Sequence, residues 1–120
     1  MDHIVPAMLT FRNQIKLYHW KTGSYSRHKA TDEFLELFDQ KVDKFVETML
    51  GGRDAKIKDK FKIEFIVTSD KNITSYVNDF KDYLIEELPK HLNDRETDLL
   101  NLRDEILNDI NQVLYLFRLS

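Results

Sequence analysis

Four runs of apolar residues spaced three and four positions apart constrain the fold of this chain more than any other feature. Such spacing places apolar side chains on one face of a helix, and each run therefore predicts an amphipathic helix. The helices are expected over residues 3–21, 27–50, 70–88 and about 93–120. Because 120 residues suffice for one hydrophobic core, the helices should pack as a single domain over residues 1–120.

Residues that commonly begin or end helices flank these runs. Short polar side chains cap helix starts, glycine often follows a helix end, and proline cannot continue the hydrogen-bond ladder. The expected signals are, in chain order, a cap at Ser26, a stop at Gly51-Gly52, a cap at Ser69-Asp70, a stop at Pro89 and a capping-box-like start from Asn93 to Glu96.

The lengths of the connections predict how the helices are joined. Short first and last connections make two antiparallel hairpins, and the long connection between residues 50 and 70 can cross the bundle from end to end. This all-α pattern is typical of a ferritin-like four-helix bundle. Residues 60–67 alternate as a strand does, but a lone strand has no partner. We therefore expect an extended segment packed across the bundle.

Composition limits the partners of the chain. Without cysteine, any metal site must use histidine and carboxylates. The net charge is −3 and basic residues form no arm at either end, so nucleic acid is not an expected partner. The apolar stretches are shorter than a membrane span, and no signal peptide is recognisable at the start. The expected location is the cytoplasm, without membrane contact.

Five residues near the first hairpin form the candidate metal site: His19, His28, Asp32, Asp43 and Glu47. Two residues four positions apart on a helix share one face. His28 and Asp32 form one such pair, and Asp43 and Glu47 form the other. A turn near residue 23 would bring the first histidine level with the second. Imidazole and carboxylate together suit hard or borderline metal ions, zinc and manganese among them.

One chain cannot bring both pairs to the same ion. Asp32 and Asp43 are separated by about 16 Å of helix, although the two pairs lie within about 60° of each other around it. A two-fold axis near Leu37 and Phe38 would oppose each pair to the other pair of a second chain. We therefore expect a homodimer through the helix over residues 27–50, with two identical sites.

The order His19-Trp20, His28-x-x-x-Asp32 and Asp43-x-x-x-Glu47 resembles the signature of Dps-like miniferritins. The resemblance implies a ferroxidase that oxidises iron(II) with peroxide or dioxygen, with ligands from both subunits, and a dodecameric shell that stores ferric iron. The stretch LYHWKTGSYSRHKA is also similar to short ferritin-like proteins of phages and large DNA viruses. That similarity implies a place in the host cytoplasm or the virion.

A second function class is also compatible with these residues. Each pair alone is commonly an ion pair or an exposed acidic patch on a solvated helix. Trp20 could pack against a metal site or against an interface. The alternative is thus a metal-free ferritin-like structural or interaction module, such as one of viral origin, that dimerises through the same helix.

Overall fold

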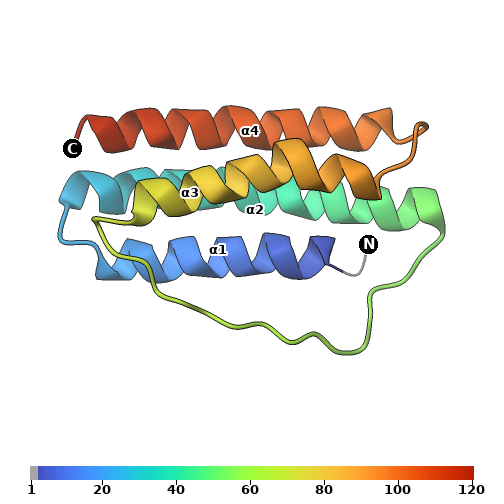
Figure 1. Ribbon diagram of the computed structural model, residues 1–120, viewed down its shortest axis with the longest axis horizontal. Coiled ribbons are helices and arrows are strands. Elements are labelled where there is room, and N and C mark those ends of the chain that lie inside the picture. The colour runs from blue at the N-terminus through green and yellow to red at the C-terminus, as the bar shows by residue number, and fades with distance from the viewer. Residues whose placement is uncertain (1–2) are drawn as a thin grey trace.

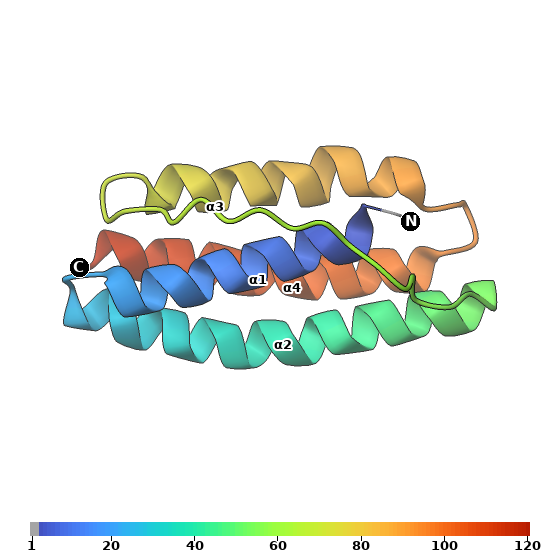
Figure 2. The ribbon, with the colours of Figure 1, turned by 90° about the horizontal axis from the view of Figure 1, so that it is seen from below.

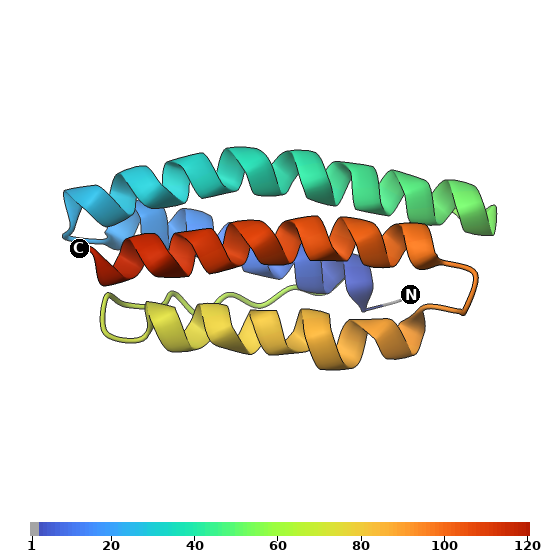
Figure 3. The same cartoon turned by 90° about the horizontal axis from the view of Figure 1, so that it is seen from above.

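Four α-helices lie side by side in the computed structural model, which describes residues 3–120 (Figure 1). They are α1 (Ile4–Lys21), α2 (Tyr25–Arg53), α3 (Ile73–Asp82) and α4 (Thr97–Arg118). Short turns make antiparallel hairpins of α1 with α2 and of α3 with α4. Seen from above, α4 lies between α2 and α3 (Figure 3). The expectation of an all-helical bundle is confirmed, and no strand occurs among the described residues.

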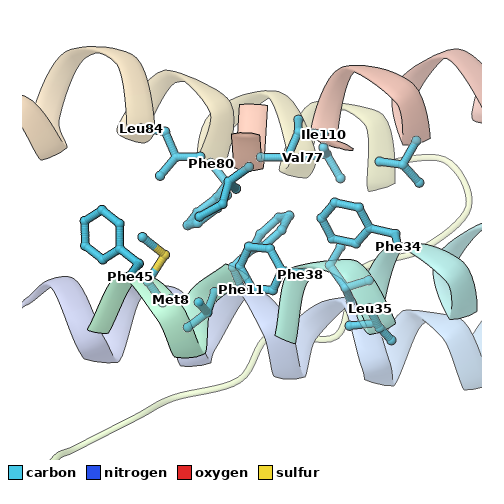
Figure 4. Packing of buried hydrophobic residues seen from close by; sticks show 14 of the residues in the cluster. Met8, Phe11, Phe34, Leu35, Phe38, Phe45, Val77, Phe80, Leu84 and Ile110 are labelled. Carbon is cyan, nitrogen blue, oxygen red and sulfur yellow. The ribbon is translucent and has the colours of Figure 1, made fainter. Parts of the chain in front are cut away.

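The predicted apolar faces form the core of the bundle. Figure 4 shows rings from three helices meeting at its centre. Phe11 of α1 stacks on Phe80 of α3 with 3.8 Å between ring centroids, and it also contacts Phe34 and Phe38 of α2 edge-on. Burying one such side chain contributes about 1.5–3 kcal/mol. Aromatic packing between hairpins therefore holds them together.

Both ends of α2 differ from the prediction. Ser24, not Ser26, caps the helix, because its hydroxyl accepts a hydrogen bond from the Arg27 amide at 3.3 Å. Gly51 and Gly52 remain helical, and the chain leaves the helix at Asp54, whose φ is 48°. A helix tolerates glycine at a cost of about 1 kcal/mol each, and contacts of the following arginine offset that cost.

Arg53 provides those contacts at the end of α2. Its guanidinium donates two hydrogen bonds of 2.7 Å to the Glu96 carboxylate and one of 2.8 Å to the His91 carbonyl. The same carboxylate accepts from the Asn93 amide at 2.9 Å, which is one half of the predicted capping box. The helix itself begins later, at Thr97, with the Glu96 backbone outside the helical region (φ −92°, ψ 44°).

The predicted Ser69-Asp70 cap is wrong. The Ser69 carbonyl accepts from the Ile73 amide, and α3 starts without a side-chain cap. The Asp70 carboxylate instead accepts hydrogen bonds from the Tyr18 hydroxyl at 2.7 Å and the Thr22 hydroxyl at 2.5 Å. These hydrogen bonds lower the pKa of Asp70. The residue ties the end of the long connection to the α1–α2 turn.

Pro89 does not end the helical path where expected. A π-helical turn (Tyr83–Glu87) and a 3-10 turn (Leu88–His91) follow α3 directly. In the π-turn the Leu88 amide bonds to the Tyr83 carbonyl, so the next carbonyl, of Leu84, would need the amide hydrogen that Pro89 lacks. Arg103 of α4 donates to that carbonyl at 3.0 Å and satisfies it.

The connection over residues 54–72 is extended and runs along the bundle beside α1 (Figures 1 and 2). Phe61 packs against the core, and the Gln14 amide donates to the Ile66 carbonyl, while the Ile66 side chain is 81% exposed. An extended segment packed on the bundle is thus confirmed. No helix of residues 3–120 is long and apolar enough to cross a membrane.

Candidate metal centre

His19 and His28 meet beside the turn between α1 and α2. Their rings stack with 3.8 Å between centroids and an interplanar angle of 17°. The turn places the end of one helix level with the start of the next, as the sequence predicted. His19 is only 5% exposed, whereas His28 is partly exposed. The two imidazoles therefore form a pair with one side toward the core and one side toward solvent.

Hydrogen bonds define which ring nitrogens carry protons. Nδ1 of His28 lies 2.8 Å from the His19 carbonyl, which can only accept, so Nδ1 donates. Nδ1 of His19 lies 2.9 Å from the Thr31 hydroxyl, and that hydroxyl gives its own proton to the Arg27 and His28 carbonyls. Both neutral rings are thus Nδ1–H tautomers, and each Nε2 keeps a lone pair.

Electrostatics keeps His19 neutral. Burial lowers its pKa below the ordinary value, and the neighbouring His28 lowers it further. The charge of Asp32 acts in the opposite direction but more weakly. A neutral imidazole is the form that binds a metal ion, so no proton has to be displaced from this ring near neutral pH.

Asp32 lies one helical turn after His28 and is exposed. It completes the set of side chains that the sequence grouped at this end of α2. The other predicted pair, Asp43 and Glu47, lies one turn apart on the same helix, also exposed. A hydrogen bond with Asp43, followed by the charge of that residue, raises the pKa of Glu47. Two carboxylates that interact in this way can share a proton or a cation.

The structure brings the five predicted residues together only in part. The two histidine rings stack, and Asp43 and Glu47 interact with each other one turn apart, but these carboxylates lie further along α2 than His28. Within residues 3–120 of a single chain, no three His, Asp or Glu side chains are placed to hold a metal ion. A complete site would therefore need ligands from elsewhere.

Leu37 and Phe38, near which the sequence predicted the two-fold axis, lie on different sides of α2. Phe38 is fully buried in the core, and Leu37 lines a groove against α4 together with Asp109 and Leu116. On the side toward α1, Asp39 accepts two 3.0 Å hydrogen bonds from Arg12. Residues turn by about 100° per position, so a shift of two positions changes the side of the helix. Leu37 and Phe38, the residues expected at the two-fold axis, therefore do not lie on the α1 side of α2, where Asp39 lies.

Two contributors to the site were not predicted. Thr31 accepts from His19 and thereby orients its ring. Its position three residues after His28 is a helical spacing that could have revealed it. Asp70 secures the turn that carries the histidines, with hydrogen bonds to Tyr18, Thr22 and the Gly23 amide. Asp70 comes from a distant part of the chain, so no local sequence pattern predicts its contact with this turn.

A second histidine pair lies at the opposite end of the bundle. The rings of His3 and His91 are 3.9 Å apart between centroids, at an angle of 71°. Nδ1 of His3 is 3.0 Å from the Tyr83 hydroxyl, and Nε2 of His91 is 3.4 Å from a Glu87 oxygen. The contact with His91 lowers the pKa of Glu87. The sequence showed no pattern that connects these residues.

Comparison with known proteins assigns a family. The model of a family of unknown function, DUF5856, matches residues 19–117 and so includes all five candidate ligands, α2 and α3 in full, and α4 except for its last residue. No curated protein and no solved structure matches the chain. The match covers most of the 120 residues. The chain therefore belongs to DUF5856, a family of unknown function.

Proposed function

We propose that this protein binds and oxidises iron(II) at a site shared between two copies of the chain, as Dps-like miniferritins do. The observation that carries the proposal is the histidine pair. His19 and His28 lie in contact, and both keep the Nε2 lone pair available because Nδ1 is used for an orienting hydrogen bond. Metal-binding histidines are commonly oriented in this way by a carbonyl or hydroxyl behind the ring.

The path of the chain supports the same family of folds. Two antiparallel hairpins are joined by a long connection that runs along the bundle, and this connectivity is the one expected of a ferritin-like fold. A fold by itself does not determine function, so the ligand positions carry more weight. The ligand order along the chain, with histidines first and the Asp43-Glu47 pair later, is the order that the resemblance implies.

A second copy would complete the ligand set. His28-Asp32 and Asp43-Glu47 are separated by about 16 Å along α2 and are all partly or fully exposed. A two-fold axis at the height of the Arg12–Asp39 ion pair, on the α1 side of the helix, would oppose each pair to the other pair of the mate. Two identical sites per dimer would result.

Each residue would have a distinct role toward iron(II), which is the substrate. His19 and His28 would bind the ion through Nε2, and Asp32 would add a carboxylate from the same chain. Asp43 and Glu47 of the second copy would neutralise its charge and favour the ferric product, since hard oxygen ligands prefer the higher oxidation state. Each iron(II) gives one electron to the oxidant, which is peroxide or dioxygen. Zinc or manganese could occupy the same ligands.

The second candidate is a metal-free structural or interaction module that dimerises through α2. One specific observation favours it. The Nδ1 hydrogen bonds already give both histidines a structural role in the turn, and one chain does not contain three converging ligands within residues 3–120. In this case removal of metal would change neither the oligomer nor its stability.

An anaerobic iron(II) titration of metal-stripped protein separates the two candidates. Absorbance and native mass are recorded together, and oxidant is then added. Saturation near two ions per dimer, followed by rapid formation of iron(III), supports the miniferritin function. The mass also reports whether a dodecameric shell forms. Absence of saturable binding would reject the function and favour the metal-free module.

A further inference from the structure

We infer that Trp20 of one copy inserts into an apolar groove between α1 and α2 of a second copy, and so acts as the anchor of the dimer. The inference rests on the proposed function, because it uses the two-fold axis that completes the metal site. It adds the contact that would hold the two copies in that orientation.

Trp20 is unusually exposed for its type. Its side chain is 66% exposed at the end of α1, and the Lys16 ammonium lies over its ring, 5.1 Å from the centroid. Tryptophan is the residue that most often anchors protein interfaces, because burying its large surface contributes more than burying any other side chain. An exposed tryptophan beside a candidate inter-subunit site therefore points to a contact with a partner.

The groove lies at the other end of the same face. Val5 and Leu9 of α1 and Val42 and Val46 of α2 line it, and the Arg12–Asp39 ion pair borders it, with a volume of about 330 Å³. Leu9 is 38% exposed there. Asp43, one of the candidate ligands, is also part of the lining. An apolar floor beside the site of the mate is thus available to a large side chain.

Equal spacings bring the tryptophan to the groove. Trp20 follows Leu9 by eleven positions on α1, as Asp43 follows Asp32 by eleven positions on α2. Both separations equal about 16 Å and three helical turns. A two-fold rotation that places the Asp32 end of one copy on the Asp43 end of the other must also place the Trp20 end of α1 on the Leu9 end of its mate.

Charge complementarity supports the same placement. Lys16 lies one turn before Trp20 and next to its ring, so it would arrive with the tryptophan. The rim of the groove carries Asp43, and Glu47 lies one turn further along α2. In a single chain these two carboxylates repel each other. A lysine from the second copy would relieve that repulsion at the edge of the contact.

The chain contains a single tryptophan, so its fluorescence reports on this contact alone. Metal-stripped protein is diluted through the monomer–dimer transition, which sedimentation measures, while the emission maximum and acrylamide quenching are recorded. We expect a shift to shorter wavelength and at least a two-fold reduction in quenching as dimers form. Val46→Asp and the milder Leu9→Lys should both remain monomeric, with the emission of an exposed indole.

The matched control is Ile66→Asp, because Ile66 is 81% exposed on the long connection, away from the groove. It should dimerise and shift its emission as the unmodified chain does. A dimer with unchanged emission, a chain that stays monomeric at every concentration, or groove variants that still dimerise would each overturn the inference. Iron binding is measured separately. An indole that becomes buried in a dimer that does not bind iron would reject only the proposed iron function. Iron binding by a dimer whose indole stays exposed would reject only the Trp20 contact.

Discussion

The two ends of the bundle each hold a pair of histidines, and the pairs differ in what surrounds them. At the α1–α2 turn the rings of His19 and His28 stack at 17°, and at the other end the rings of His3 and His91 meet at 71°. Ring centroids are equally close, at 3.8 and 3.9 Å. Distance alone therefore does not distinguish a candidate metal site from a packing contact.

The hydrogen bonds of the ring nitrogens make the distinction. In the first pair only Nδ1 of each ring is used in a hydrogen bond, and the Asp43–Glu47 pair lies on the same side of α2 as His28. In the second pair Nε2 of His91 already contacts Glu87, and Lys90 lies 3.5 Å from the other oxygen of that carboxylate. Nε2 of both rings is thus unused in the first pair, which is why that pair carries the proposed metal site, whereas the second pair lies beside the Glu87–Lys90 ion pair.

The largest effect in this comparison is expected when a candidate ligand is removed, while a histidine of the other pair serves as control. His28→Ala and Glu47→Ala should each reduce rapid iron(II) oxidation more than about 100-fold, because loss of a direct ligand costs more than loss of a supporting residue. His91→Ala is the matched control and should oxidise iron at the original rate. Stopped-flow absorbance measures the rates, and circular dichroism checks the folds. Retained rapid oxidation in both ligand variants would contradict the assignment.

A smaller effect should follow when the orientation of a ring is disturbed. Thr31→Val keeps the shape of the side chain but removes the hydroxyl that accepts from His19. We expect iron(II) affinity to fall by about 10–100-fold, the usual cost of losing such a supporting contact. Thr48→Val, on the same helix but away from the histidines, is the control. Equal affinities in an anaerobic titration would show that Thr31 does not position the ring.

The smallest expected effect is on stability in mild acid. The pKa of His19 is lowered in the folded chain, so the unfolded chain, with an ordinary value near 6.5, takes up the proton first. The free energy of unfolding should therefore fall as the pH drops below 6.5. Urea titrations of metal-free protein measure this, and the fall should be weaker in His19→Gln. An identical pH dependence in that variant would assign the effect to other groups.

Much of the bundle follows from local patterns. The apolar stripe of α2, which includes Phe34 and Phe38, predicted both the helix and its buried face, because the period of a helix decides which side chains meet the core. The contact between His19 and His28 was also predictable, since a short turn leaves neighbouring helix ends level with each other. Four of the candidate ligands lie on α2, so their spacing was known before the structure.

Helix ends and supporting contacts were less predictable. Local rules suggested that Asp70 caps α3 and that the helix stops before Pro89. Tyr18 and Thr22 compete for the Asp70 carboxylate, and Arg103 replaces the hydrogen bond that the proline cannot make. These competitors come from helices far away in the sequence. Energies of about 1 kcal/mol decide a cap, and one tertiary hydrogen bond is of the same size.

The sequence by itself determined that the chain forms amphipathic helices and that its candidate ligands fall into two groups along one of them. Periodicity and spacing are local properties of a helix, so no tertiary information was required. Only the tertiary structure decided that Asp39 faces α1 while Leu37 faces α4, and that each histidine keeps Nε2 available. Those outcomes depend on which helix packs beside which, and a single helix does not contain that information.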